Sequence, residues 1–144
     1  MIPEEASHMS LFKAFEIAAS GVTAQSQRLN ATASNLANAE SAVGPGGKAY
    51  QAKQVVFQSA QIDARDPHSQ GVRVQKVIED QSEPRRVHDP KHPMADDSGY
   101  VTMPNVSVAE EMVNMLSASR SYQSNIEVMN TAKSLLLKTL SLGN

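Results

Sequence analysis

Cysteine and tryptophan are both absent from this 144-residue chain, and aromatic residues make up only 4% of it. Without cysteine the chain cannot form disulfides, thiolate metal sites or cysteine nucleophiles. So few aromatic residues are unusual for the core of an enzyme. The formal net charge is −2, which gives no electrostatic basis for binding nucleic acid or an anionic membrane. Alanine, serine, asparagine, glutamine and valine are frequent instead, a composition suited to packed helices with small contact residues.

Long apolar runs are also missing. No stretch reaches the roughly 18 apolar residues that a transmembrane helix requires, so we expect no direct membrane insertion. No basic segment followed by an apolar one opens the chain, so we expect no cleavable signal peptide. The tripeptide Ser7-His8-Met9 resembles a cloning junction. We therefore interpret residues 1–8 as a non-native leader and exclude them from the fold prediction, although an upstream start codon is an alternative.

The most regular pattern lies between Ser107 and Leu142, where neither glycine nor proline interrupts the chain. Residues spaced alternately by four and three positions form a heptad a/d repeat, and eight of the ten are apolar or aromatic. The repeat consists of Val108, Met112, Met115, Ser119, Tyr122, Ile126, Met129, Lys133, Leu136 and Leu140. The pattern predicts a C-terminal helical segment over residues 107–144, with Ser107 as its N-cap and Glu110 completing a capping box.

A second repeat with the same spacing follows the predicted leader. It consists of Leu11, Phe15, Ala18, Val22, Gln25, Leu29, Thr32 and Leu36. We expect an N-terminal helix from Leu11 to about Asn38, within a segment of residues 9–43, with Ser10 as its N-cap. The polar members of both repeats either fix the register of the helices or lie at partly hydrated edges.

Neither helix is expected to be stable alone, because ordering such a long segment costs more than one exposed helix recovers. Burying each apolar side chain of the repeat contributes about 1.5–3 kcal/mol, but only if a partner covers it. The two helices could pair with each other as a hairpin, pair with other subunits, or do both.

The middle segment, residues 44–106, has a different character. Glycines and a proline between Ala42 and Gly47 end the first helical region. Residues 50–58 have moderate strand character, and residues 71–80 form a good short strand that we expect to pair with Val55–Phe57. Residues 81–98 are polar and contain three prolines, so we expect loop or extended chain there, followed by a short strand at Tyr100–Met103. The predicted fold is therefore mainly α, with a coiled-coil-like pair of terminal helices and a small β-rich middle.

The densest group of side chains that could perform chemistry is His88, Asp89, His92, Asp96 and Asp97. The two histidines have the spacing of a helical zinc site, but two prolines in the same span make helical geometry unfavourable. We interpret the group as solvated loop residues. No phosphate-binding loop, nucleophile elbow or helical zinc motif is present. We therefore predict no catalytic residues, no metal site and no cofactor; an enzyme that uses this loop is the weakest hypothesis.

Two stretches of the sequence carry motifs that are more specific than hydrophobic periodicity. Residues 33–39 read Ala-Ser-Asn-Leu-Ala-Asn-Ala, which resembles the Ser-x-Asn-Leu-Ala-Asn signature of the bacterial flagellar axial proteins of rod and hook. Residues 99–106 and 118–133, together with Tyr50–Phe57, are similar to the corresponding segments of the proximal-rod subunits in that family. Glu40-Ser41 departs from the threonine-containing ending that is common after the signature. The resemblance extends over essentially residues 9–144.

The resemblance implies a structural subunit of the flagellar basal body. Such a subunit is exported unfolded through the flagellar type III apparatus and polymerises into the helical drive shaft that crosses the periplasm and surrounds the export channel. Its implied partners are other copies of itself, sibling rod proteins, and probable hook-basal-body adaptor, membrane-ring and export-gate components. A coiled-coil adaptor of a secretion apparatus that never polymerises is the alternative. The expected subunit-interface residues are Leu29, Asn35, Leu36, Asn38, Met112, Met115, Tyr122, Ile126, Met129 and Leu136.

Overall fold

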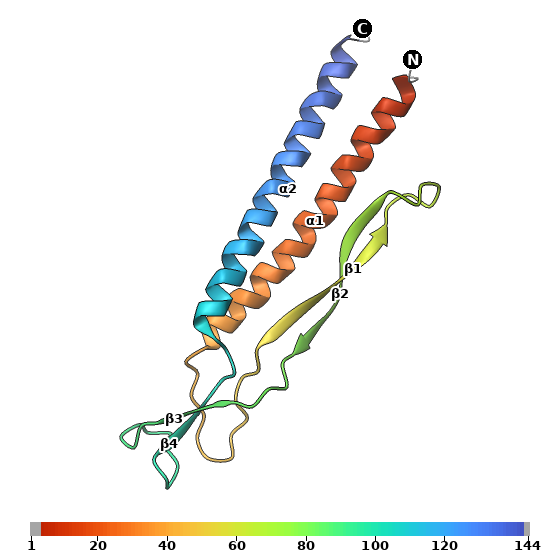
Figure 1. Cartoon of the computed structure of the whole chain (residues 1–144). Coiled ribbons are helices and arrows are strands. Elements are labelled where there is room, and N and C mark those ends of the chain that lie inside the picture. Colours follow the sequence, from red (N-terminus) through yellow and green to blue (C-terminus); the bar gives the residue numbers. More distant parts are fainter. Residues whose placement is uncertain (1–3, 143–144) are drawn as a thin grey trace. The chain divides into compact units, whose positions relative to one another are not determined.

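The computed structural model describes residues 4–142, and its elements are shown in Figure 1. In chain order they are α1 (Glu4–Asn38), β1 (Lys53–Gln61), β2 (Gln70–Glu79), β3 (Arg85–His88), β4 (Tyr100–Met103) and α2 (Val108–Leu142). The predicted class, mainly α with a small β-containing middle, is confirmed. Among the helices described, none is both long and apolar enough to span a bilayer.

The first helix ends where the sequence predicts but begins earlier. α1 starts at Glu4, so Ser10 lies inside the helix and the prediction that it forms the N-cap is wrong. The reason is local: residues 4–8, Glu-Glu-Ala-Ser-His, contain no glycine or proline to stop the helix. At the other end, the Asn38 side chain donates to the Ser34 carbonyl oxygen (2.9 Å) and its own carbonyl accepts from the Ser41 amide (3.1 Å). These bonds satisfy groups that the end of a helix leaves free.

The start of α2 agrees with the predicted cap. The Ser107 hydroxyl accepts a hydrogen bond from the Glu110 amide at 3.4 Å, and the Ser107 carbonyl accepts one from the Glu111 amide at 2.9 Å. Both glutamates lie in the first turn, where negative charge is favourable to the helix dipole.

The strands form two separate two-stranded sheets. β1 pairs with β2, as predicted for these segments. β3 was not predicted, because its sequence Arg-Arg-Val-His lacks the apolar alternation that marks a strand. It forms because β4, which was predicted, offers an antiparallel partner, with Val87 opposite Val101 and His88 opposite Tyr100.

The chain divides into two compact units, and each contains part of both helices. Of the described residues, 4–27, 57–75 and 117–142 form the first unit, and residues 28–56 and 76–116 form the second. A small core in the second unit is formed by Ala39, Ala52 and Val106, with Tyr50 packed against it. The buried residues in the described part of the chain are mostly small and form no large apolar core.

Contacts between α1 and α2 occur within each unit, but the inner face of α2 differs from the predicted repeat. Ala118 and Ala132 are fully buried, whereas Val108, Met112 and Leu140 of the predicted repeat are exposed. Within one subunit α1 does not cover these last three residues, so of the alternatives left open for the repeat, pairing with other subunits is the one still available to them. Short side chains permit close approach of two helices, and the large apolar residues are left on the outer side.

Gly21 illustrates how close this approach is within the first unit. A Cβ atom placed on Gly21 would lie 2.8 Å from Nδ2 and 2.9 Å from Cγ of Asn125. The distance is shorter than real Cβ contacts allow, so the asparagine or the helix would have to move.

We expect Gly21→Ala to gain little of the roughly 1 kcal/mol that alanine offers in helix propensity, because the Asn125 side chain has to turn away and lose its hydrogen bond to the Ser121 carbonyl oxygen. Asn125→Ala on its own is the control. In the double variant the collision is gone, so alanine at position 21 should become stabilising by about 1 kcal/mol. Thermal or denaturant unfolding of the four proteins measures both effects. A Gly21→Ala change that stabilises as much with Asn125 present as with Asn125→Ala would contradict the close packing.

Candidate functional site

Most of the large apolar side chains that are exposed lie on α2, where eight of them fall in two groups. The N-patch is near the start of the helix and consists of Val108, Met112, Val113 and Leu116. The C-patch is near its end and consists of Leu135, Leu137, Leu140 and Leu142. Exposure reaches 67% at Val113 and 85% at Leu142. Grouped apolar side chains of this size mark a surface for binding to protein or membrane.

The expected interface residues differ in how far they are exposed. Met112 is exposed and belongs to the N-patch, whereas Asn35 is buried, with 1% of its surface exposed. The remaining eight are half-buried: Leu29, Leu36, Asn38, Met115, Tyr122, Ile126, Met129 and Leu136. A role for each of these residues in subunit contacts stays a prediction.

Most of the two patches lies outside the predicted repeat. The heptad pattern included only Val108, Met112 and Leu140, because it assumes one apolar stripe per helix. The run Leu135-Leu136-Leu137 was the available signal, since three consecutive leucines cannot share one face of a helix. Such a run predicts apolar contacts on more than one side of the helix.

Asn35, in the signature motif, joins three segments of the second unit. Its Oδ1 accepts hydrogen bonds from the Lys53 amide (2.8 Å) and the Tyr50 hydroxyl (2.9 Å). Its Nδ2 donates to the Lys53 carbonyl oxygen (2.9 Å) and to Oε2 of Glu111 (3.1 Å). The amide thus pairs with the backbone of β1 as a neighbouring strand would, and it also ties α1 to α2.

The network continues along the two helices. Asn114 donates to Oε1 of Glu111 at 3.3 Å and accepts a hydrogen bond from Arg28 at 3.2 Å. These residues line a polar cavity of 280 Å³ within the second unit. Amide, carboxylate and guanidinium groups therefore join the facing surfaces of α1 and α2 in this unit.

A second asparagine, Asn105, holds the segment that precedes α2. Asn105 accepts a hydrogen bond from the Ala52 amide (2.8 Å) and donates to the Asp80 carbonyl oxygen (2.9 Å) and to both oxygens of Ser82. The start of β1, the end of β2 and the approach to α2 are held by one side chain. Together Asn35 and Asn105 position the N-patch on a well-defined helix start.

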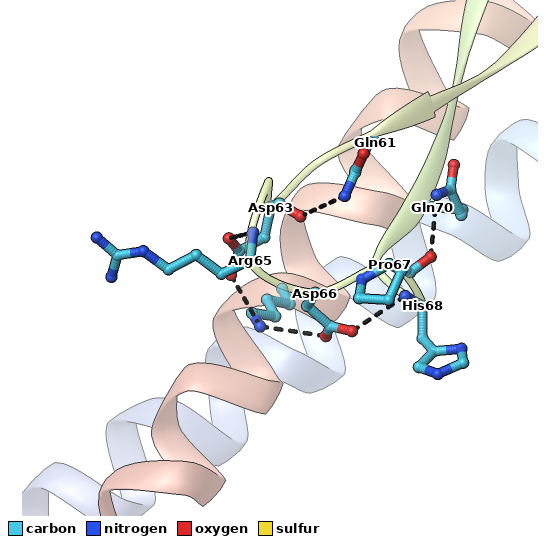
Figure 2. A network of polar contacts seen from close by, with 8 residues as sticks. Gln61, Asp63, Arg65, Asp66, Pro67, His68 and Gln70 are labelled. Atoms are coloured by element: carbon cyan, nitrogen blue, oxygen red, sulfur yellow. Dashed lines mark hydrogen bonds and ion pairs between the residues drawn. The ribbon is translucent and has the colours of Figure 1, made fainter.

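In the first unit, Lys13 holds the loop between β1 and β2 against α1. Its ammonium lies 2.9 Å from a carboxylate oxygen of Asp63 and 3.2 Å from one of Asp66. Figure 2 shows these two aspartates among the polar residues of the loop. The two aspartates also accept hydrogen bonds from the backbone amides of Arg65 and His68. These amides, and then Lys13, lower the pKa of Asp63 and of Asp66, while the two carboxylates raise the pKa of Lys13.

The ionisable side chains of residues 88–97 form their contacts within the same part of the chain. The Asp96 carboxylate accepts from the amides of Ser98 and Tyr100 and pairs with Arg86, and these bonds lower the pKa of Asp96, the Tyr100 amide contributing most. His88 packs edge-on against Tyr100, and His92 accepts a hydrogen bond from the Met94 amide. Among the described residues, no group of three histidines or carboxylates is arranged to hold a metal ion.

Comparison with known proteins identifies relatives along nearly the whole chain. Residues 15–45 match the family described as Flagella basal body rod protein, and residues 97–142 match the Flagellar basal body rod FlgEFG protein C-terminal family. Flagellar basal-body rod protein FlgC of Yersinia enterocolitica is 58% identical, and that of Salmonella typhimurium is 57% identical. Both alignments cover 94% of this chain and 99% of the relative. The corresponding protein of Buchnera aphidicola subsp. Acyrthosiphon pisum is 47% identical over 93% of this chain and 98% of its own length.

We expect Asn35→Ala to lower the free energy of unfolding by roughly 2–4 kcal/mol, because it leaves the Lys53 backbone, Tyr50 and Glu111 without buried partners. Asn38→Ala is the matched control in the same motif and should cost less than about 1 kcal/mol, since its amide bonds only to Ser34 of its own helix and to the exposed Ser41 that follows it. Denaturant unfolding measures the difference. Equal costs for the two variants would mean that Asn35 does not join the three segments.

The Lys13 contacts predict a defined pH dependence. A carboxyl whose pKa is lowered on folding stabilises the loop above its ordinary pKa, 3.8 for aspartate, and loses that effect as pH falls through the lowered value. We expect NMR titration to place the midpoints of Asp63 and Asp66 below 3.8. Lys13→Met should raise both pKa values only in part, because the Arg65 and His68 amides remain, and Lys48→Met should leave them unchanged. Midpoints that do not respond to Lys13→Met would contradict the contact.

Proposed function

This chain belongs to the FlgC family of flagellar basal-body rod proteins, and we propose that it polymerises through its terminal helices into the rod that transmits torque. The family, shown by identities of 47–58% over at least 93% of the chain, confirms the resemblance read from the sequence. The chain is therefore a structural subunit of the basal-body rod and not an enzyme. Polymerisation is the step that the following observations support.

The exposed apolar surface of α2 carries this proposal. Eight large apolar side chains in the N-patch and C-patch are between 40% and 85% exposed. Complete burial contributes about 1.5–3 kcal/mol per side chain, so a neighbour that covers even part of the two patches gains substantial stability. Because the buried residues of the subunit are mostly small, much of the apolar burial available to this chain arises only on assembly.

The expected interface residues act in two ways in this proposal. Met112 contacts neighbouring subunits directly, and the half-buried apolar residues on α1 and α2 contribute the area they still expose. Asn35 and Asn38 act indirectly, because their amides are engaged inside the subunit. Residues 9–43 and 107–144 form the axial segments of the rod, and residues 44–106 pack outward or against neighbours.

Export and assembly are part of the same proposal. We propose that the subunit passes unfolded through the flagellar type III apparatus without a cleaved signal, and that its helices surround the export channel in the assembled rod. The absence of disulfides and of a large subunit core is compatible with passage as an unfolded chain. Its partners are then sibling rod proteins and its own copies, with adaptor, ring and export-gate components at the base.

The alternative, an adaptor that never polymerises, needs only one partner surface. Two separate apolar patches on one helix favour the polymer, since a chain that extends in two directions needs two contacts per subunit.

Deletion of Leu136–Asn144 tests the proposal in cells that lack the chromosomal copy. We expect loss of motility and absence of the chain from purified basal bodies, because three of the four C-patch residues are removed. Gln123→Ala, an exposed polar change on the same helix, is the control and should restore motility. Protection of the Tyr50 and Lys53 region from hydrogen exchange should persist in the deleted protein. Rods that assemble normally with the deleted chain would overturn the proposal.

A further inference from the structure

The polar cavity of the second unit contains hydrogen-bonding groups that the unit itself does not use. Thr32 lines the cavity with only 4% of its surface exposed, and within the second unit its hydroxyl makes no hydrogen bond. Glu110 also lines the cavity, is exposed, and forms no ion pair among the described residues. Buried polar groups normally have a partner, either ordered water or a ligand. At 280 Å³ the cavity is much larger than the roughly 30 Å³ share of one water molecule, so it has room for a ligand group.

The charges around this cavity favour a cation. Its lining carries three carboxylates and two cations, a formal balance of −1: Asp80, Glu110, Glu111, Arg28 and Lys53. The Arg28 guanidinium donates to Asn114, and the Lys53 ammonium lies 5.8 Å from the centroid of the Tyr50 ring. Among the described residues, no three histidines or carboxylates are arranged to hold a metal ion, so an organic cation fits better than a metal.

The lining distinguishes between the organic cations that proteins carry. Ala31 and Ala52 add apolar surface to the same cavity, which suits a methylene chain. An ammonium has three N–H donors and no acceptor, and the cavity offers it the Thr32 hydroxyl and the Glu110 carboxylate. A guanidinium fits less well, because it is planar and Arg28 already places one beside this cavity. An alkylammonium group is therefore the best match.

We propose that the polar cavity receives a lysine side chain from a neighbouring protein in the basal body, with its ammonium held by Glu110 and Thr32. This inference rests on the proposed function only for the place of that neighbour, because the cavity belongs to the single subunit. Asn35 and Asn105 already hold the segments that form the cavity, so binding has to order little. An ammonium left without a carboxylate partner would be costly to bury, which makes the site selective for its charge.

Titration of the purified full chain with a lysine analogue tests the proposal. The probe is Nα-acetyl-lysine N-methylamide, followed by NMR of the backbone amides, and the matched probe is the norleucine analogue, which lacks the ammonium. We expect the lysine probe to shift the amides of Thr32 and Glu110, and the norleucine probe to bind roughly 10-fold more weakly. Cadaverine, a free diamine, should bind no more tightly than the lysine probe. A preference for cadaverine would make this a site for free diamines and overturn the assignment to a protein partner.

Variants of the full chain separate the contributions to binding. Glu110→Gln should weaken binding of the lysine probe by roughly 5–10-fold and Thr32→Val by roughly 3-fold, since each removes one partner of the ammonium. Lys53→Met removes a cation from the lining and should tighten binding by about 2-fold. Thr32→Val should not lower the free energy of unfolding, because its hydroxyl has no partner in the unit. Glu127→Gln, an exposed change on the same helix outside the cavity, is the matched control.

Carbodiimide cross-linking of purified basal bodies identifies the neighbour. We expect mass spectrometry to find Glu110 joined to a lysine of another protein, and Thr32→Val to lower the yield of this link but not of any formed by Glu127. Two results would overturn the inference: lysine and norleucine probes that bind equally or not at all, and basal bodies in which Glu110 is joined to no lysine. Neither result bears on polymerisation, which the motility and rod assembly of the Leu136–Asn144 deletion decide separately.

Discussion

The hydrogen bonds of Asn35 are the constraint on which the second unit depends. One side-chain amide pairs with both backbone groups of Lys53, binds Tyr50 and reaches Glu111 on α2. A buried amide with four partners is costly to displace, because each group left behind would be desolvated and unpaired. The start of β1, the end of α1 and the first turns of α2 therefore have one mutual arrangement. Asn105 adds the end of β2 to the same arrangement.

The polar character of this network explains the unusual distribution of apolar residues. Where α1 and α2 meet in the second unit, Arg28, Asn114 and Glu111 form the contacts, and in the first unit Gly21 admits Asn125. Such contacts specify which surfaces pair but bury little apolar area. The leucines, the valines and Met112 of the patches therefore remain exposed on the subunit. In the proposed rod these side chains supply the contact surface between subunits.

Specificity and adhesion are thus separated within one short chain. The asparagine network and the Lys13 contacts shape the subunit, and in the proposed rod the patches of α2 contribute the energy of association. The separation suits a structural protein that has to reach its site before it assembles. In the His88–Asp97 region, which is dense in ionisable groups, Asp89, His92 and Asp96 accept hydrogen bonds from backbone amides of the loop between β3 and β4.

The sequence by itself determined the two terminal helices, the pairing of β1 with β2, the cap at Ser107 and the family, because heptad spacing, strand alternation and signature motifs are local patterns. Only the tertiary structure decided which face of each helix points inward. A heptad repeat records apolar spacing, but Ala118 and Ala132 are buried because small residues let the helices approach, and that preference depends on the partner. For the same reason β3 and the four bonds of Asn35 were not predictable in detail, since each needs groups that lie far along the chain.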